Sequence, residues 1–381
     1  MDLDTRYPAL SDLRARARRR IPHFMWEYLD SATGTETGMV RNRAALDRVL
    51  FLPQVLKGEV TADLSVELLG CKQGLPFGIA PVGMSGAMWP GAERILAELG
   101  ARHAIPYAMS TMATRAPEDV ADVVGDQGWF QLYPPRDPAV RADMLARIKG
   151  AGFHTLVLTV DVPASSRRER QIRGGLTHPP QITPRTLWHI AQCPAWALGT
   201  ARLGMPKMRF IERYSEHKGA LPSTAHIGYL MRIAPEWDYV EMLREEWSGK
   251  FVVKGVLDPE VSLRLKDAGV DAVWVSNHAA RQFDGAPAAL DCLPGIRAAV
   301  GPEYPLIYDS GIEGGLDILR AIAMGADFVF LGKAFHYALG ALGAAGAEHL
   351  VQMLTADLRA NLGQLAAEKP ADVRKAVVSG V

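Results

Sequence analysis

The sequence predicts a (β/α)8 TIM barrel, an α/β fold in which eight parallel strands close into a cylinder surrounded by helices. From about residue 76, short apolar, β-prone runs alternate with helix-patterned segments. The runs are apolar throughout, which is typical of parallel strands covered by helices. Eight such runs occur, and that number favours a closed barrel over an open doubly wound sheet.

The expected elements follow each other regularly along the chain. Strands are expected at residues 77–81, 106–110, 129–133, 155–159, 251–254, 272–276, 306–309 and 328–332. Helices between them include residues 90–102, 138–150, 259–268 and 316–324.

The remaining segments extend this barrel. Residues 1–75 predict a helical extension with a small β segment around 63–70, and the barrel is expected over 76–367. An excursion at 163–235, after the fourth strand, is long enough to be a functional loop or lid. A helix begins at Trp237, and a helix-rich tail follows the eighth strand, leaving residues 368–381 as a C-terminal tail.

Composition excludes several function classes. Of the 381 residues, 42 are basic and 42 acidic, so no global charge favours nucleic acid. The three cysteines are scattered without a CxxC pair, which argues against a disulfide framework or a zinc site, and we expect no metal. No apolar run approaches the ~20 residues that span a bilayer. We therefore expect a cytoplasmic protein, at most peripheral at the inner membrane face.

Polar side chains gather where the expected strands end, and in such barrels this mouth carries the active site. The strand ends carry Ser110, Gln131, Tyr133, Thr159, Asp161, Lys254, Ser276, His278, Asp309 and Lys333. Turn residues alone would leave mainly Gly, Asn and Ser at these positions. Ionisable groups at so many strand ends therefore favour a catalytic site.

Single residues allow alternatives. Lys254 ends an apolar strand and needs an anionic or polar partner, either a ligand or Asp309. Arg281 would anchor a carboxylate or pair with Asp284. Asp161 would orient a histidine or cap the following loop, and a lone His278 is more often a surface histidine than a base.

Six motifs, in order along nearly the whole chain, resemble those of the FMN-dependent 2-hydroxy-acid oxidase and dehydrogenase family. Residues 276–284 read SNHAARQFD and are similar to the family's SNHGGRQLD motif. The other similar segments are residues 79–83, 130–133, 158–161 and 253–255, and the N-terminal segment that carries Tyr28 and Asn42-Arg43. The subgroup of bacterial lactate and mandelate dehydrogenases is the most similar.

The resemblance implies FMN as cofactor and oxidation of an (S)-2-hydroxy acid to the 2-oxo acid. His278 is then the base, Asp161 stabilises its imidazolium, and Tyr133 hydrogen-bonds the reacting oxygen. Tyr28, Arg168 and Arg281 hold the substrate carboxylate, with Met112 in the substrate pocket. Lys254 lies near the flavin edge that becomes negative on reduction. The further cofactor contacts implied are Pro81, Val82, Gly83, Ser110, Gln131, Thr159, Ser276, Asp309, Gly311, Gly332 and Lys333.

Two departures from the family pattern concern phosphate and substrate. Glu313 and Lys333 replace the two arginines that usually hold the FMN phosphate, so we expect weaker FMN retention. Backbone N–H groups of the glycines at 311, 314, 315 and 332 would remain to cradle the phosphate. Small groups at Gly83 and Ser165, beside Met112, predict a substrate side chain larger than that of glycolate.

The partners stay open at this stage. Residues 185–213 interleave Trp, Leu and basic residues, which suits peripheral membrane contact, but a lid or a subunit interface explains them equally well. Membrane docking would favour a quinone as electron acceptor over a cytochrome or O2. For the oligomeric state, the resemblance suggests a homotetramer. A barrel that has lost its cofactor, or a phosphate-binding lyase or isomerase, remains the alternative to the oxidoreductase.

Overall fold

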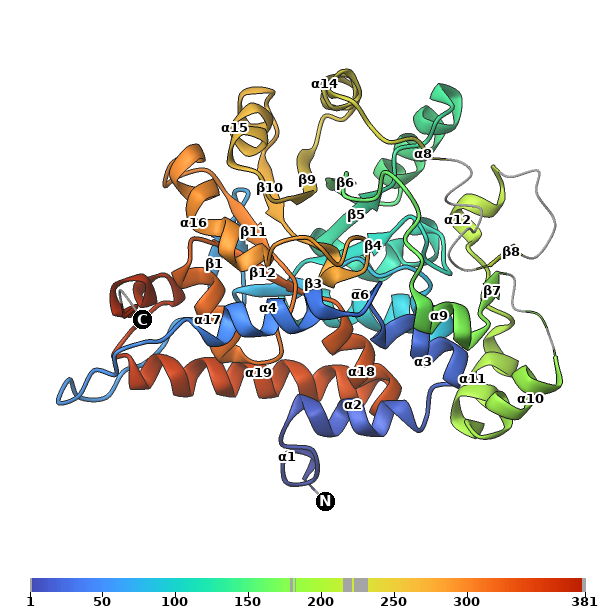
Figure 1. Ribbon diagram of the computed structural model, residues 1–381, viewed down its shortest axis with the longest axis horizontal. Coiled ribbons are helices and arrows are strands. Elements are labelled where there is room, and N and C mark those ends of the chain that lie inside the picture. Colours follow the sequence, from blue (N-terminus) through green and yellow to red (C-terminus); the bar gives the residue numbers. More distant parts are fainter. Residues whose placement is uncertain (1, 179–180, 182, 215–220, 223–231, 379–381) are drawn as a thin grey trace.

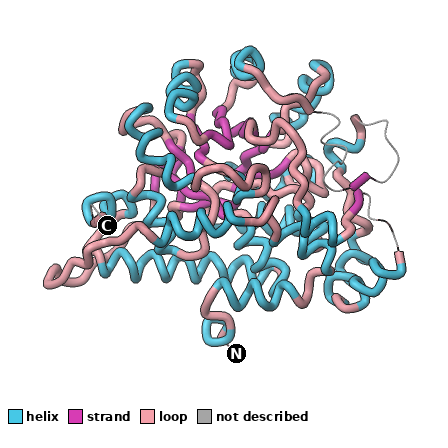
Figure 2. The backbone as a smooth tube through the Cα atoms, in the orientation of Figure 1, coloured by secondary structure: helices cyan, strands magenta, loops and turns pink. Residues whose placement is uncertain are grey.

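The computed structural model describes residues 2–178, 181, 183–214, 221–222 and 232–378. Eight parallel strands form a closed barrel in the order β10-β11-β12-β3-β4-β5-β6-β9. Figure 2 shows these strands at the centre of the molecule, with helices around them. The predicted (β/α)8 barrel is confirmed.

Each of the eight expected runs overlaps one barrel strand. The strands are β3 (Phe77–Ile79), β4 (Tyr107–Ser110), β5 (Gly128–Leu132), β6 (Thr155–Thr159), β9 (Lys250–Val256), β10 (Ala272–Val275), β11 (Leu306–Tyr308) and β12 (Phe328–Leu331). The pairing of β6 with β9 places Thr159 opposite Lys254. Because all strands are parallel, their carboxyl ends meet at one mouth of the barrel.

Large aromatic side chains fill the inside of the barrel. Trp274 stacks on Phe330 with ring centroids 4.2 Å apart, and Trp129 lies 5.3 Å from Phe330. Leu68 joins this interior cluster from a hairpin of β1 (Val66–Leu68) and β2 (Cys71–Gln73) that precedes the barrel. The interior is therefore a packed core, which leaves the mouth as the place for a ligand.

The helices between strands start and stop as their sequences predict. At α8 (Pro138–Gly150) and α15 (Pro259–Asp267), an aspartate caps the first turn and proline stands at the first position. The other helices that follow barrel strands are α6 (Ala92–His103), α7 (Ala121–Val124), α14 (Trp237–Glu246), α16 (Ala289–Val300), α17 (Gly315–Ala323) and α18 (Lys333–Leu342). Short helices α5 (Ser85–Met88), η1 (Pro117–Asp119), η2 (Gly125–Gln127) and η3 (His278–Ala280) lie in loops.

Both ends of the chain pack on the same side of the barrel (Figure 1). The N-terminal helices are α1 (Leu3–Arg6), α2 (Leu10–Arg18), α3 (His23–Asp30) and α4 (Thr37–Asp47), and the C-terminal ones are α19 (Ala344–Gln364) and η4 (Pro370–Ala376). Helix α2 lies so close to α18 that a Cβ on Gly340 would stand 3.1 Å from Ala17 Cβ. This packing brings α2 and α3 to the mouth of the barrel.

The segment between β6 and α14 carries its own small elements. They are α9 (Glu169–Gly174), β7 (Thr177–His178), α10 (Pro184–Ala191), α11 (Pro194–Leu203), α12 (Arg209–Glu212) and β8 (Leu221–Pro222). Helix α9 packs on α3, and β7 pairs with β8. The return of the chain to the barrel begins at Arg232, which forms a β-bridge with Pro135 after β5.

Candidate active site

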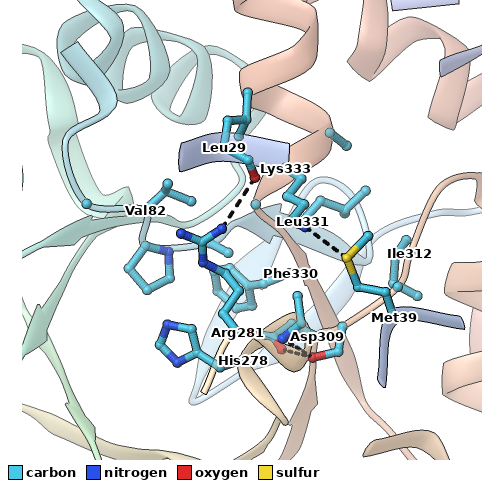
Figure 3. A pocket seen from close by; sticks show the side chains of 18 of the residues that line it. Leu29, Met39, Val82, His278, Arg281, Asp309, Ile312, Phe330, Leu331 and Lys333 are labelled. Carbon is cyan, nitrogen blue, oxygen red and sulfur yellow. Dashed lines mark hydrogen bonds between the residues drawn. The ribbon is translucent and has the colours of Figure 1, made fainter. Parts of the chain in front are cut away.

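A cavity of about 210 Å3 opens at the carboxyl ends of the strands. It brings together most of the residues expected there, as Figure 3 shows for several of them. The lining includes Tyr28, Pro81, Val82, Gly83, Ser110, Met112, Tyr133, Arg168, Lys254, His278, Arg281, Asp309, Gly311, Gly332 and Lys333. The expected residues Gln131, Thr159, Asp161 and Ser276 stand behind this lining, beside the groups that face the cavity.

His278 and Asp161 form a hydrogen-bonded pair at the cavity. His278 Nδ1 lies 3.1 Å from Asp161 Oδ1 and 3.2 Å from Oδ2. An ionised carboxylate can only accept, so Nδ1 carries the proton and donates it to Asp161. The lone pair of Nε2 is then available to take a proton, which is the state that a general base requires.

The electrostatics keep this base neutral. Burial lowers the pKa of His278, and the cations of Lys254 and Arg168 lower it further, while Asp161 opposes the shift. Burial alone would raise the pKa of Asp161, but His278 and Lys254 outweigh it and hold that pKa below its usual value. At neutral pH the pair therefore consists of a carboxylate and an uncharged imidazole.

The turn that presents His278 is strained. His278, Ala279 and Ala280 have φ values of 56°, 51° and 59°, and none of them is glycine. Left-handed backbone costs an L-residue roughly 1–2 kcal/mol. Side chains compensate by holding the N–H groups: Ser276 Oγ accepts from His278 N at 2.9 Å, and Ser310 Oγ accepts from Ala279 N at 3.1 Å.

Lys254 faces the cavity and also forms the ion pair with Asp309 that the sequence left open. Its Nζ lies 2.8 Å from Asp309 Oδ2 and donates to Ser276 Oγ at 2.7 Å. Only 4% of Lys254 is exposed, and its ammonium lies 5.1 Å from the centre of the Trp274 ring. Ser276 itself is fully buried and donates to Asp309, so it acts through Lys254 and not on the cavity directly.

Two arginines and a tyrosine form one wall. The guanidinium of Arg281 lies 5.2 Å above the Tyr28 ring, and its Nη1 donates to the carbonyls of Tyr28 and Ser31. Arg168 Nε donates to the carbonyl of Arg281 at 3.2 Å and to a nearby serine hydroxyl. The alternative partner of Arg281, Asp284, instead accepts from backbone N–H groups at the start of α4.

The end of the cavity where the sequence places the FMN phosphate does not offer all the backbone N–H groups expected there. The N–H groups of Gly315 and Leu316, at the start of α17, already donate to the carboxylate of Asp357 on α19. The N–H of Glu313 donates to Asp317, so the start of α17 is occupied by the protein's own acids. The part of the expected cradle that used the N–H of Gly315 is therefore wrong.

The start of α18 remains open to an anion. Gly332, Lys333 and Ala334 line the cavity at the N-terminus of this helix, where the helix dipole favours negative charge. Lys333 Nζ donates to the carbonyls of Asp30 and Ser31, and burial next to Arg281 lowers its pKa to about 7. Glu313 stands exposed at the rim of this end.

The space beside Met112 is smaller than the sequence suggested. A Cβ on Gly83 would stand 2.9 Å from Met112 Cβ and 3.2 Å from the Tyr28 hydroxyl, so the missing side chain at 83 is needed for packing. Ser165 is exposed and lies outside the cavity lining. Neither position therefore adds room for a larger substrate, so the expectation of extra space at Gly83 and Ser165 is wrong.

Two basic residues of the described lining were missed from the sequence. They are Arg14 on α2, which pairs with Asp30 at 2.6 Å, and Arg232 at the end of the excursion. Both lie outside the strand ends and outside the motifs that resemble the family. Arg43 on α4, which lies in one of those motifs, also lines the cavity and pairs with Asp317 at 2.5 Å.

The comparisons with known proteins agree with this geometry. The model of a family described as FMN-dependent dehydrogenase matches residues 17–380. The chain belongs to this family. It is therefore an FMN-dependent oxidoreductase, and the lyase or isomerase interpretation is excluded.

Relatives and solved structures cover nearly the whole chain. The L-lactate dehydrogenase of Ectopseudomonas mendocina (strain ymp) is 36% identical over 369 residues, 96% of this chain and 97% of the relative. That of Caulobacter vibrioides (strain NA1000 / CB15N) is 33% identical over 371 residues, 97% of each chain. The crystal structure of the monotopic membrane protein (S)-mandelate dehydrogenase has a TM-score of 0.91 at 30% identity, covering 98% of this chain and 99% of that one.

Buried polar atoms in this FMN-dependent dehydrogenase fit the cofactor. Among the described residues, Gln131 Nε2 and Thr159 Oγ1 are buried without a hydrogen-bond partner. Ser110 donates to Gln131 Oε1 at 2.9 Å, which leaves the amide N–H2 directed elsewhere. A flavin ring offers carbonyl and ring-nitrogen acceptors for such donors, and Lys254 supplies a cation beside them.

We predict that Glu313 weakens the binding of FMN through its phosphate. Replacing Glu313 by Gln or Arg should tighten FMN binding by about tenfold. Two like charges ~4 Å apart repel by roughly 1 kcal/mol in bulk water and by roughly 4 kcal/mol near a protein surface. Titration of the flavin-free protein by fluorescence measures this, with riboflavin, which lacks phosphate, as the parallel ligand. The exposed Glu303→Gln is the control; equal tightening of riboflavin, or no tightening of FMN, contradicts the prediction.

We predict a characteristic pH dependence for Asp161→Asn. The base must be neutral to accept a proton, so the rate of flavin reduction by substrate should rise with pH and then level off. The midpoint of this rise should be the pKa of His278, which lies below its usual value. Removing the charge that raises this pKa should move the acidic limb to lower pH. The plateau should fall roughly 100-fold or more, because the imidazolium loses its partner. Stopped-flow measurement of flavin reduction over a range of pH tests this, with Asp143→Asn as the control variant. A shift of the acidic limb to higher pH in Asp161→Asn would refute the prediction.

Proposed function

We propose that this FMN-dependent dehydrogenase oxidises an (S)-2-hydroxy acid to the matching 2-oxo acid, with His278 as the base. The observation that carries the proposal is the pairing of His278 with Asp161 in the cavity that Arg168, Arg281 and Lys254 also line. FMN, when bound, accepts the two electrons that leave the substrate carbon. The remaining chemistry belongs to side chains of the chain itself.

The arginine wall gives the substrate its orientation. Arg281 and Arg168 would hold the carboxylate, because guanidinium groups match carboxylate geometry with two parallel hydrogen bonds. Tyr28, whose hydroxyl donates to the carbonyl of Gly83 at 3.1 Å, stands beside them.

Proton transfer follows from the His278–Asp161 geometry. His278 Nε2 would take a proton from the substrate, and Asp161 would stabilise the imidazolium that results. Tyr133 would hydrogen-bond the substrate oxygen. Lys254, beside the flavin donors Gln131 and Thr159, would stabilise negative charge that builds up during oxidation.

Relatives named lactate and mandelate dehydrogenase support substrates with an alkyl or aryl side chain over glycolate. The steric argument from Gly83 and Ser165 no longer adds to this, since neither position enlarges the cavity. The homotetramer that the resemblance suggests stays a prediction.

We further propose that helices α10 and α11 contact a membrane surface, which makes a quinone the preferred electron acceptor. Among the described helices, none is long and apolar enough to cross a bilayer. Leu187, Trp188, Leu198, Leu203 and Met205 are nevertheless 46–66% exposed. Large exposed apolar groups of this kind suit an interfacial segment. The (S)-mandelate dehydrogenase of the solved structure is described as a monotopic membrane protein, which supports membrane contact of this chain as well.

The excursion also has parts that face its own barrel. Trp196 is buried and donates from Nε1 to the carbonyl of Ala87 at 2.9 Å, so it anchors α11. The basic residues Lys207, Arg209 and Arg213 lie within 3.6–4.0 Å of acids, so only part of their charge is available to anionic lipid. The apolar residues, more than the basic ones, support the contact.

The function test is anaerobic bleaching of the flavin. The purified protein should be yellow and lose its flavin absorbance on addition of an (S)-2-hydroxy acid. His278→Gln should retain the colour while bleaching falls at least 100-fold, in keeping with the usual contribution of a general base. The surface variant His154→Gln is the control. A coloured wild-type protein that no 2-hydroxy acid bleaches would exclude the proposed function and leave a non-catalytic barrel.

Membrane contact is tested with vesicles. The variant Leu187→Glu/Trp188→Glu should lose most sedimentation with phosphatidylglycerol-containing vesicles, because charge cannot enter the apolar layer. Leu56→Glu is the matched control, since Leu56 is fully exposed on the loop that follows α4, far from α10 in Figure 1. If wild type fails to sediment, or both variants behave alike, the helices serve as a lid or an interface instead.

A further inference from the structure

Arg170 on α9 is a half-buried cation that the proposed chemistry does not use. Its guanidinium binds three carboxylates: Nε lies 2.7 Å from Glu27 Oε2, Nη2 lies 2.9 Å from Asp30 Oδ2, and Nη1 lies 3.2 Å from Glu36 Oε2. All three acids belong to the α3–α4 segment (residues 27–36), which runs from the end of α3 to the residue before α4. Arg170 does not line the cavity, so any part that it takes in the reaction must act through another residue.

The two residues that precede Arg170 also bond to the α3–α4 segment. Arg168 N donates to Thr33 Oγ1 at 3.3 Å, and Glu169 Oε2 accepts from Gly34 N at 2.9 Å. Arg168 has a φ of 47°, a left-handed conformation that is unfavourable for a residue with a side chain. Three consecutive residues therefore hold this strained turn against the α3–α4 segment, and α9 packs on α3 beside it (Figure 1).

The α3–α4 segment also holds the other arginine of the substrate wall. Arg281 Nη1 donates to the carbonyls of Tyr28 at 2.8 Å and Ser31 at 2.7 Å, and its guanidinium lies above the Tyr28 ring. Both arginines are thus fixed to one segment, Arg281 through backbone carbonyls and Arg168 through the start of α9. The distance between the two guanidinium groups depends on how firmly α9 is attached to that segment.

The end of α3 has partners besides Arg170. Burial would raise the pKa of Asp30, but Arg14, Arg170 and Lys333 outweigh it and hold that pKa below its usual value, so the carboxylate is ionised at neutral pH. Without Arg170, Asp30 would keep Arg14 at 2.6 Å and the Tyr337 hydroxyl at 2.9 Å. The carbonyl of Asp30, which accepts from Lys333 Nζ at 2.8 Å, would then stay in place. Loss of Arg170 therefore detaches α9 more than it disturbs the end of the cavity expected to hold the FMN phosphate.

We propose that Arg170 is a positioning residue: by binding three carboxylates it fixes α9 on α3, and thereby sets Arg168 at the distance from Arg281 at which both bind the substrate carboxylate. The inference rests on the proposed function, because it assumes that these two arginines hold that group. The carboxylate is unchanged by the oxidation, so its contacts are equally strong in the ground state and the transition state. Loss of Arg170 should therefore weaken substrate binding with little effect on the chemical step.

Anaerobic stopped-flow reduction of the flavin measures these two quantities separately. With (S)-lactate or (S)-mandelate, whichever bleaches the wild-type holoenzyme faster, it gives the limiting rate of reduction and the dissociation constant of the acid. Arg170→Met should raise this dissociation constant by about tenfold or more and lower the limiting rate by less than about threefold. Arg170→Lys, which keeps the charge but not the forked contact with three acids, should restore part of the affinity.

Binding is also measured without turnover. The matching 2-oxo acid, pyruvate or phenylglyoxylate, lacks the hydrogen that is removed, so titration of the oxidised flavin spectrum reports its binding alone, which should weaken to the same extent. The dissociation constant of FMN, measured by fluorescence with the flavin-free protein, should change by less than about threefold because Asp30 stays anchored. Arg141→Met is the matched control, since Arg141 pairs with Glu246 at 2.8 Å between α8 and α14 and does not line the cavity.

Glu27→Gln tests whether Arg170 acts through α3. The double variant Arg170→Met/Glu27→Gln should bind the acid about as weakly as Arg170→Met alone, because both changes remove the same contact. If Arg170→Met does not fold, the milder variants Arg170→Lys and Glu27→Gln decide the question. Each should bind the acid more weakly than the wild type at an unchanged limiting rate.

The outcomes separate this inference from the function itself. If the variants leave the dissociation constant of the acid unchanged, or lower the limiting rate or the affinity for FMN as much as they weaken the acid, Arg170 only stabilises the fold. The inference is then overturned while the proposed function stands. If no 2-hydroxy acid bleaches the wild-type flavin, the proposed function fails and the inference fails with it.

Discussion

The carboxylate of Asp309 ties three strand ends of this barrel together. It accepts from Lys254 on β9, from Trp274 and Ser276 at the end of β10, and from Ser310 beside it. A buried ammonium is tolerated only with such a partner, so the position of Lys254 depends on this carboxylate. Two of the four donors, Ser276 and Ser310, also hold backbone N–H groups of the turn that presents His278.

That turn shows how the scaffold offsets local strain. Three consecutive left-handed residues without glycine are unfavourable in themselves. They persist because serine hydroxyls and the side chain of Asn277 accept from their N–H groups, and because Thr33 N, just after α3, donates to the carbonyl of Ala280. His278 is therefore held by the same network that holds the buried ammonium of Lys254, and the two side chains reach the cavity in a set relative position.

The cavity divides into two ends with different electrostatic tasks. At one end, imidazole, ammonium and guanidinium groups surround the place where an anionic substrate would react. At the other, the start of α18 offers a helix dipole, while the start of α17 is already satisfied by Asp357. The anion-binding capacity of a barrel mouth thus depends on which helix starts the protein leaves open, and not only on the presence of glycines.

The sequence by itself determined the barrel and most of the polar residues that gather at its mouth. Apolar runs of strand length, spaced by helical patterns, are local properties, and parallel closure then requires Asp161, Lys254, His278 and Asp309 to meet at one mouth. Their pairing, however, could not be read from the chain: Lys254 had two possible partners and Arg281 had two, and packing chose between them.

Only the tertiary structure decided which residues from outside the barrel strands line the mouth of the barrel. Arg14 and Arg232 reach the cavity from helix α2 and from the end of the excursion, and Asp357 reaches the start of α17 from α19. Gly83, which suggested open space, is instead filled by Met112 and Tyr28. The physical reason is common to all four. Periodicity and strand-end chemistry act between neighbours in sequence, whereas these contacts depend on how segments tens to hundreds of residues apart pack against each other.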